Sequence, residues 1–204
     1  MNMFNTVEEV VEDLRNGKIV LVSDPEEREH EIDMISSCQS ATPDVINFMA
    51  THARGLICMP MSKEKADSLS LEMMTAYNTD VHHTAFTVSI DDKDAKTGIS
   101  AFERSDTALK VARKDATRKD FRSPGHMFPL VARDGGVLER EGHTEATVDL
   151  MRIAGLEECG LCCEIMADDG SMMHLDGVGD LMKKFGLKLV SIDQIVEYRK
   201  KHNI

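Results

Sequence analysis

The stretch Phe121–Thr147, FRSPGHMFPLVARDGGVLEREGHTEAT, holds two Gly-His pairs and an arginine-bearing loop that runs directly into a helical pattern. Thr144–Ala154 has apolar residues at roughly helical spacing and stops before Gly155. We predict a helix over this segment, with Thr144 as its N-cap, because a threonine hydroxyl can accept hydrogen bonds from the first turn.

The start of this helix suits an anion. Helix N-termini present unpaired N–H groups and the positive end of the helix dipole. Arg140, the backbone of Gly142 and the hydroxyl of Thr144 can therefore hold a phosphate or a carboxylate. His143 lies at the same rim and would face the bound group. The alternative is that this segment is only a charged turn.

A second distinctive stretch, Asp24–Asp33, follows the apolar strand pattern of Lys18–Val22, and six of its ten residues are acidic. Dense acidic runs are usually solvated or disordered, but this one lies between two apolar runs, since Met34–Ile35 follows it. Carboxylates at a strand end suit Mg²⁺ or Mn²⁺. Arg28 can hold a substrate anion or keep one carboxylate ionised. We therefore favour a functional loop.

Composition limits the class of protein. The 204 residues can bury one large core, so we expect a single domain over residues 1–204. A formal charge of −12 argues against nucleic-acid and anionic-membrane surfaces. Small anions would need a divalent cation or a local basic pocket, for which Arg28, Arg104 and Arg140 are the candidates. The apolar runs are too short to span a membrane, and no secretion signal is seen.

The five cysteines form no disulfide framework of the secreted kind. Cys159–Cys162 is formally a CxxC motif, but a single motif is weak evidence for zinc, and buried core cysteines are favoured. We expect a cytoplasmic protein.

Helical and strand patterns alternate along the chain, so the expected fold class is α+β, a layered α/β sandwich with a mixed sheet. Helices are expected from the capping box at Thr6–Glu9 to Gly17, and over Thr42–Met49, Ser62–Leu69, Ala101–Arg113, Asp176–Phe185 and Asp193–Lys200. Strands are expected at Lys18–Val22, Asp33–Cys38, Gly55–Met59, Ala85–Ile90, Gly160–Met166 and Leu187–Ile192, with a turn at Asp91–Asp92.

Three further positions are candidates for the site. Glu164 lies inside an apolar strand pattern, where an unpaired carboxylate is costly, so it is an acid/base candidate unless that strand is an exposed edge. His82–His83 can supply metal ligands, but a polar loop lining the same cleft is preferred. Arg104 lies one turn past the start of the expected helix Ala101–Arg113 and can face a phosphate, or it can simply be solvated.

Several ordered motifs together resemble the 3,4-dihydroxy-2-butanone 4-phosphate synthase family over nearly the whole chain. These motifs are Arg28–Asp33, Gly55–Cys58, Thr84–Thr87, Thr97–Ser100, Ser123–His126, Arg140–Glu145 and Cys163–Glu164.

The resemblance implies a lyase of riboflavin biosynthesis that converts D-ribulose 5-phosphate to L-3,4-dihydroxy-2-butanone 4-phosphate and formate. It implies a Mg²⁺ (or Mn²⁺) cofactor, a Mg-stabilised enediolate, dehydration, skeletal rearrangement and formate loss, and a homodimer with active sites near the subunit interface. By motif, the implied metal ligands are Glu29 and His143; the catalytic residues are His126, Glu164, Glu29 and Asp33; and the substrate-binding residues are Arg28, Glu29, Asp33, Arg140, Glu141, Gly142, His143, Thr144 and Glu164.

Two positions depart from the family pattern, which usually has glycine where this chain has Ile32 and His83. A side chain is costly there if the backbone needs positive φ or approaches the substrate closely. The competing interpretations are a non-catalytic sugar-phosphate-binding paralogue and a Mg²⁺-dependent phosphate-ester hydrolase. The hydrolase is disfavoured because the sequence shows no nucleophilic Asp motif and no dense His/Asp metal cluster.

Overall fold

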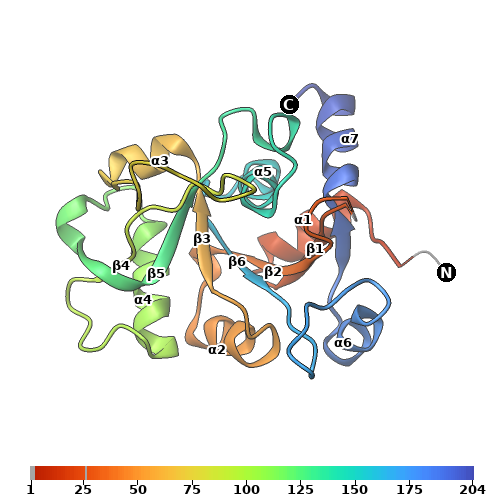
Figure 1. Ribbon diagram of the computed structural model, residues 1–204, viewed down its shortest axis with the longest axis horizontal. Helices are drawn as coiled ribbons and strands as arrows, with labels where there is room; N and C mark the ends of the chain where they lie inside the picture. Colours follow the sequence, from red (N-terminus) through yellow and green to blue (C-terminus); the bar gives the residue numbers. More distant parts are fainter. Residues whose placement is uncertain (1–2, 26) are drawn as a thin grey trace.

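The computed structural model describes residues 3–25 and 27–204, so Glu26 of the acidic stretch lies outside the described residues. A seven-stranded sheet in the order β4-β5-β3-β6-β2-β1-β7 crosses the molecule (Figure 1). The strands are β1 (Val20–Ser23), β2 (Ile32–Ser37), β3 (Cys58–Met61), β4 (Ile90–Asp92), β5 (Phe121–Val131), β6 (Gly160–Glu164) and β7 (Leu189–Ser191). The helices are α1 (Val7–Arg15), α2 (Pro43–His52), α3 (Lys63–Ser68), α4 (Ala101–Val111), α5 (His143–Ala154), α6 (Val178–Phe185) and α7 (Ile192–His202).

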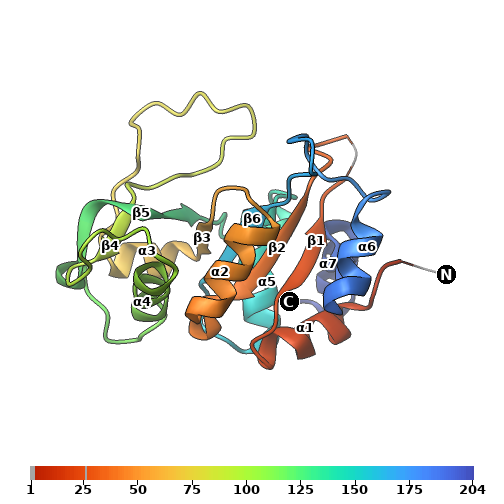
Figure 2. The ribbon, with the colours of Figure 1, turned by 90° about the horizontal axis from the view of Figure 1, so that it is seen from below.

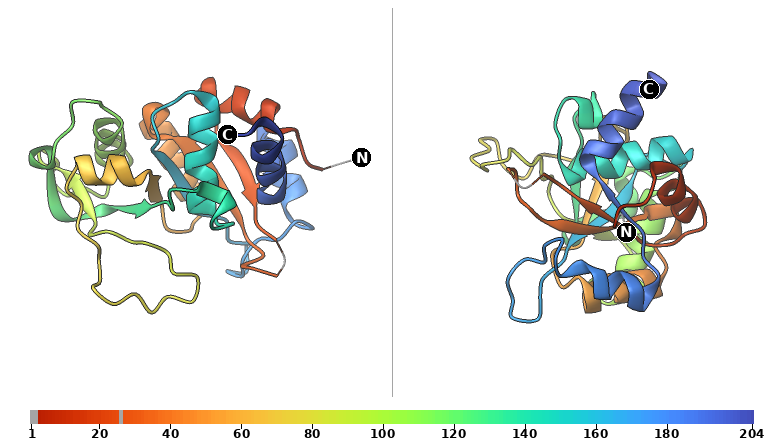
Figure 3. Two further views of the ribbon diagram at one scale, coloured as in Figure 1. Left: turned by 90° about the horizontal axis from the view of Figure 1, so that it is seen from above. Right: turned by 90° about the vertical axis from the view of Figure 1, so that its right-hand side faces the viewer.

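Helices cover both faces of the sheet (Figure 3). Successive residues of a strand point to opposite faces. Val20 and Val22 accordingly pack with α1, α5 and α7, whereas Leu21 packs with α2, α4 and α6. β1 runs parallel to β7 and antiparallel to β2, so the sheet is mixed. The expected layered α/β sandwich with a mixed sheet is confirmed.

Strand pairing gathers the carboxylates at one end of the sheet. The acidic loop joins β1 to β2, and β2 pairs with β6 so that Asp33 lies directly opposite Glu164. In the next pair of strands, Cys58 of β3 lies opposite Cys162 of β6. The long segment 70–89, olive-yellow in Figure 2, extends from the same end of the molecule as the acidic loop.

The observed helix boundaries show which of the predicted caps are correct. The capping box of Thr6 and Glu9 is present, and Thr42 caps α2 with Pro43 at its first position. The predicted Thr144 cap is wrong. α5 begins at His143, its N-cap is Gly142, and Thr144 is already helical.

In the described part of the chain, none of the helices is long and apolar enough to cross a bilayer.

The predicted strand Ala85–Ile90 is also largely wrong. Only Ile90 belongs to β4, and the expected turn Asp91–Asp92 lies within that strand. The preceding residues divide their backbone hydrogen bonds between two neighbours, since Thr87 N donates to Pro129 O and Val88 N donates to Glu72 O. The alternation of polar and apolar residues in this segment therefore comes from packing on two sides, and the segment does not form a continuous strand pairing.

Candidate active site

A pocket of about 110 Å³ opens where the acidic loop, segment 70–89 and the start of α5 meet. It brings together most of the residues that the sequence selected. Its lining is Arg28, Glu29, Glu31, Asp33, Cys58, Thr84, Phe86, Leu130, Arg140, His143, Thr144, Cys162 and Glu164.

Asp24 holds the acidic loop in place through hydrogen bonds. Its side chain is fully buried. Oδ2 accepts hydrogen bonds from Arg28 Nη1 at 2.9 Å and from Glu29 N at 3.0 Å, and Oδ1 accepts one from Glu31 N at 2.8 Å. Arg28 also pairs with the Glu29 carboxylate. The loop is therefore held around one carboxylate, which orients Glu29 toward the pocket.

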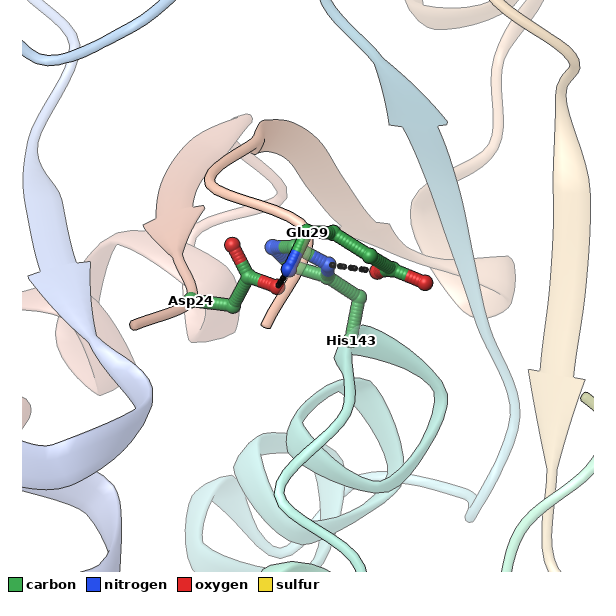
Figure 4. A group of neighbouring side chains, drawn as sticks. All are labelled: Asp24, Glu29 and His143. Carbon is green, nitrogen blue, oxygen red and sulfur yellow. Dashed lines mark hydrogen bonds and ion pairs between the residues drawn. The ribbon is translucent and has the colours of Figure 1, made fainter. Parts of the chain in front are cut away.

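His143 lies beneath Glu29 in the first turn of α5 (Figure 4). Its Nε2 is 3.1 Å from the carbonyl oxygen of Val22. A carbonyl can only accept, so Nε2 carries a proton in this bond. Nδ1 faces the carboxylates, 3.8 Å from Glu29 Oε2 and 3.9 Å from Asp33 Oδ1.

These contacts shift the pKa values in opposite directions. Burial lowers the pKa of His143, but the charges of Asp33 and Glu29 outweigh it and raise that pKa to about 9. Burial raises the pKa of Glu29, but His143 and Arg28 outweigh it and lower that pKa to about 2. For Asp33, burial dominates and raises the pKa to about 7, with the charge of Glu164 acting in the same direction.

The residues present fit a divalent cation. One ligand atom from each of Asp24, Glu29 and His143 lies within 4.8 Å of the other two (Figure 4). Asp33 Oδ1 is buried and, within the described part of the chain, makes no hydrogen bond. Carboxylate oxygens with one imidazole suit Mg²⁺ or Mn²⁺. Asp24 accepts three hydrogen bonds within the loop, two of them from backbone N–H groups, so its carboxylate already has a structural role there, and Glu29 and His143 remain the candidate ligands.

Asp33 and Glu164 form the second feature of the pocket. They are opposite residues of paired strands, so their side chains share one face of the sheet. Glu164 ends β6 and is half-buried, whereas the sequence placed it in mid-strand. Its Oε2 accepts a hydrogen bond from Leu56 N at 2.9 Å. Gly55 permits this approach, since a Cβ there would lie 2.6 Å from the same oxygen.

Two guanidinium groups converge at the start of α5. A Cβ on Gly142 would lie 2.2 Å from Arg140 Nη1 and 3.0 Å from Arg28 Nη2, so a side chain there would displace these guanidinium groups. Arg140 is fixed by the Glu145 carboxylate and by the Thr84 hydroxyl, 3.2 Å from Nη2. With the first N–H groups of the helix beside them, these cations form a cradle for an anion.

Several candidate residues are absent from the pocket lining: Gly142, His82 and His83 lie near it, and three others do not contribute to it. Glu141 is exposed, and Arg104 is on α4 away from the pocket lining. His126 is on β5 with 43% of its side chain exposed, paired with Asp91. Sequence reasoning gave no separate role to Asp24 and did not connect Asp91 to His126. The acidic pattern offered a signal for Asp24, but only strand register reveals Asp91.

The two departures from the family pattern are accommodated differently. Ile32 starts β2 and is 1% exposed, packed in the core and without a positive φ. His83 does adopt a left-handed conformation, with φ of 54°. Histidine tolerates this region better than β-branched residues do. The neighbouring His82 lies beside the cleft, with Nε2 3.8 Å from Glu29 Oε1.

Comparisons with known proteins identify the family of this chain. A family model described as 3,4-dihydroxy-2-butanone 4-phosphate synthase matches residues 8–198. The chain belongs to this family.

The riboflavin biosynthesis proteins RibBA of Bacillus mycoides and Bacillus subtilis are 48% and 50% identical over 98% and 97% of this chain. The chain spans about half the length of these curated relatives. A solved 3,4-dihydroxy-2-butanone 4-phosphate synthase in complex with two magnesium ions is 36% identical, with a TM-score of 0.92 over 97% of this chain and 98% of that one.

We expect Glu29→Gln and His143→Gln to weaken Mn²⁺ binding at least about tenfold, because each removes one ligand atom. Electron paramagnetic resonance titration of free Mn²⁺ measures this affinity. Glu27→Gln is the matched control, since Glu27 is an exposed residue of the same loop and the charge change is equal. Equal affinities in all four proteins would contradict this assignment of ligands.

Proposed function

We propose that the protein is a lyase that converts D-ribulose 5-phosphate to L-3,4-dihydroxy-2-butanone 4-phosphate and formate, a step of riboflavin biosynthesis. One observation carries the proposal: a cation-ligand pair, a carboxylate pair and a two-arginine cradle line a single pocket. A phosphorylated ketose presents a phosphate, a carbonyl and hydroxyl groups, which match these three features. Family membership and the names of the RibBA relatives support the same reaction.

The proposed cofactor is Mg²⁺, with Mn²⁺ as a substitute, held by Glu29 and His143. When bound, such a cation polarises a carbonyl group. The magnesium complex of the solved family member supports this choice.

Arg28 and Arg140 bind the phosphate group, together with Thr144 and the first N–H groups of α5. Both arginines are largely buried, with side chains 17% and 16% exposed, so their charges act in a poorly solvated site. Anchoring one end of the sugar there directs its hydroxyl groups toward Glu29 and Asp33. Exposed Glu141 would act only by supporting this loop.

Asp33 and Glu164 move the protons. A carboxylate of this pair takes a proton from the carbon beside the ketone, which gives an enediolate of the substrate. The pKa of Asp33, raised by burial to about 7, suits a group that gives and takes protons near neutral pH. Loss of water, skeletal rearrangement and formate release follow. The four-carbon product and formic acid together contain all atoms of the substrate, so no oxidant is needed.

We also propose a homodimer in which His126 of one copy serves the pocket of the other. His126 is half-exposed and lies outside the pocket of its own chain. Ile99, which follows Gly98 in the chain, and Phe102, in the first turn of α4, are 54% and 70% exposed, as an apolar contact surface requires. There His126 would act as an acid or as an orienting group.

We propose that residues 1–204 act as one domain in the cytoplasm, with no nucleic-acid or membrane partner. One sheet passes through the whole described chain. The five cysteines are free and buried, as in proteins of reducing compartments. The formal charge of −12 disfavours polyanionic partners.

Purified protein should release formate from D-ribulose 5-phosphate in Mg²⁺, and excess chelator should abolish the release. Glu164→Gln should lower turnover by about 100-fold or more while sugar-phosphate binding persists, because only the proton-transfer group changes. An enzyme-coupled formate assay and calorimetry measure the two effects. A folded wild-type protein that binds the sugar phosphate without releasing formate would instead be the non-catalytic paralogue.

Mixing two inactive variants tests the shared site. His126→Ala and Glu164→Gln homodimers should each be nearly inactive, but equal mixing after subunit exchange should restore about one quarter of wild-type turnover, because half the dimers hold one intact site. Sedimentation confirms the dimer, and native mass spectrometry of the mixed variants, which differ in mass, confirms that heterodimers form. If His126 served its own chain, the mixture would stay inactive.

A further inference from the structure

Asp91 and His126 form a closed pair outside the pocket. Asp91 lies in β4 and is 1% exposed, and His126 lies in β5. Asp91 Oδ1 accepts a hydrogen bond from His126 N at 2.8 Å, and Oδ2 lies 2.9 Å from His126 Nδ1. A carboxylate only accepts, so Nδ1 carries the proton of this second bond. Both the backbone and the imidazole ring of His126 are therefore held by Asp91.

The surrounding backbone is shaped to admit this pair. The pairing of β4 with β5 is irregular between Ile90 and Asp91, and bulges of this kind re-aim side chains. A Cβ on Gly98 would lie 2.0 Å from Asp91 Oδ2 and 2.6 Å from His126 Nδ1, and Gly98 has φ of 86°. A Cβ on Gly125 would lie 2.3 Å from Asp91 N. Neither glycine can take a side chain without displacing the pair.

The turn that carries Gly98 is itself held in place. The Glu103 carboxylate accepts hydrogen bonds from the backbone N–H groups of Lys96, Thr97 and Gly98. The turn thus closes over the imidazole from one side, and Arg122 Nη2 lies 3.9 Å from Asp91 Oδ2 on the exposed side. A simple surface ion pair does not need a strand irregularity, close-packed glycines and a hydrogen-bonded turn around it. These features together therefore suggest a specific role for His126.

We infer that Asp91 is a positioning residue for His126: it holds the imidazole with its proton on Nδ1 and leaves Nε2 as the nitrogen that exchanges protons with the substrate. When the Nε2 lone pair takes a proton, the ring becomes an imidazolium and Asp91 remains ionised beside it. The kinetic part of this inference rests on the proposed function, but the structural part does not.

Histidine ¹⁵N–¹H correlation spectra of the wild-type protein test the structural part. Neutral His126 should carry its proton on Nδ1, with its signals assigned by their loss in His126→Gln. In Asp91→Asn the amide oxygen can keep the backbone hydrogen bond, so the NH₂ group would face Nδ1 and the ring should change to the Nε2–H form. Asp92→Asn is the control, since Asp92 is a buried carboxylate one residue away, paired with Lys110.

Turnover tests the kinetic part. Asp91→Asn should lower kcat by about 100-fold or more and change KM by less than about threefold, because proton transfer is lost while binding persists. Asp92→Asn should keep the wild-type tautomer and kcat. If Asp91→Asn does not fold, the smaller Asp91→Ala, which removes the acceptor from Nδ1, replaces it.

The outcomes separate this inference from the proposed function. Wild-type His126 with its proton on Nε2, or a changed tautomer in folded Asp91→Asn with unchanged kcat, would overturn the positioning role. A wild-type protein that releases no formate would overturn the proposed function and with it the kinetic part. The tautomer would still decide whether Asp91 sets the state of the ring.

Discussion

The hydrogen bond between His143 Nε2 and the carbonyl oxygen of Val22 connects the end of β1 to the first turn of α5. It fixes the position of the helix start and the orientation of the imidazole together. Metal-binding histidines commonly donate their second ring nitrogen to a carbonyl in this way. Because Nε2 is occupied, Nδ1 is directed toward Glu29 and Asp33. The candidate cation site and the anion cradle at Gly142 both lie at the helix start that this contact positions.

This arrangement brings several negatively charged side chains close together. Glu29, Glu31, Asp33 and Glu164 all line one small pocket. Burial and the neighbouring carboxylates raise the pKa values of Glu31 and Asp33, so the charged forms of these groups are strained in this pocket. Such strain is typical of sites selected for chemistry, since stability alone would remove the charges. The two arginines already offset part of this strain, and under the proposed function a divalent cation would offset more of it and so favour phosphate binding.

Local patterns predicted the features that depend on a few neighbouring residues. The capping box at Thr6, the confined acidic loop and the helix after Gly142 follow from such patterns, and Glu164 stood out because a carboxylate rarely interrupts an apolar strand. Long-range register decided the rest. Asp33 opposite Glu164 is one such pairing, and the contact of Asp91 with His126 is another. The cap of α5 was misassigned because the Val22 contact, distant in sequence, places His143 inside the helix.

The most direct test of this account is the nitrogen that coordinates Mn²⁺. Protein containing histidine labelled with ¹⁵N only at Nδ1 should show a ¹⁵N coupling to bound Mn²⁺ in pulsed electron paramagnetic resonance, and His143→Gln should abolish it. Protein labelled only at Nε2 should lack a direct coupling, because that nitrogen donates to Val22. A direct coupling to Nε2, or no nitrogen coupling from His143, would contradict the central role of the Val22 contact.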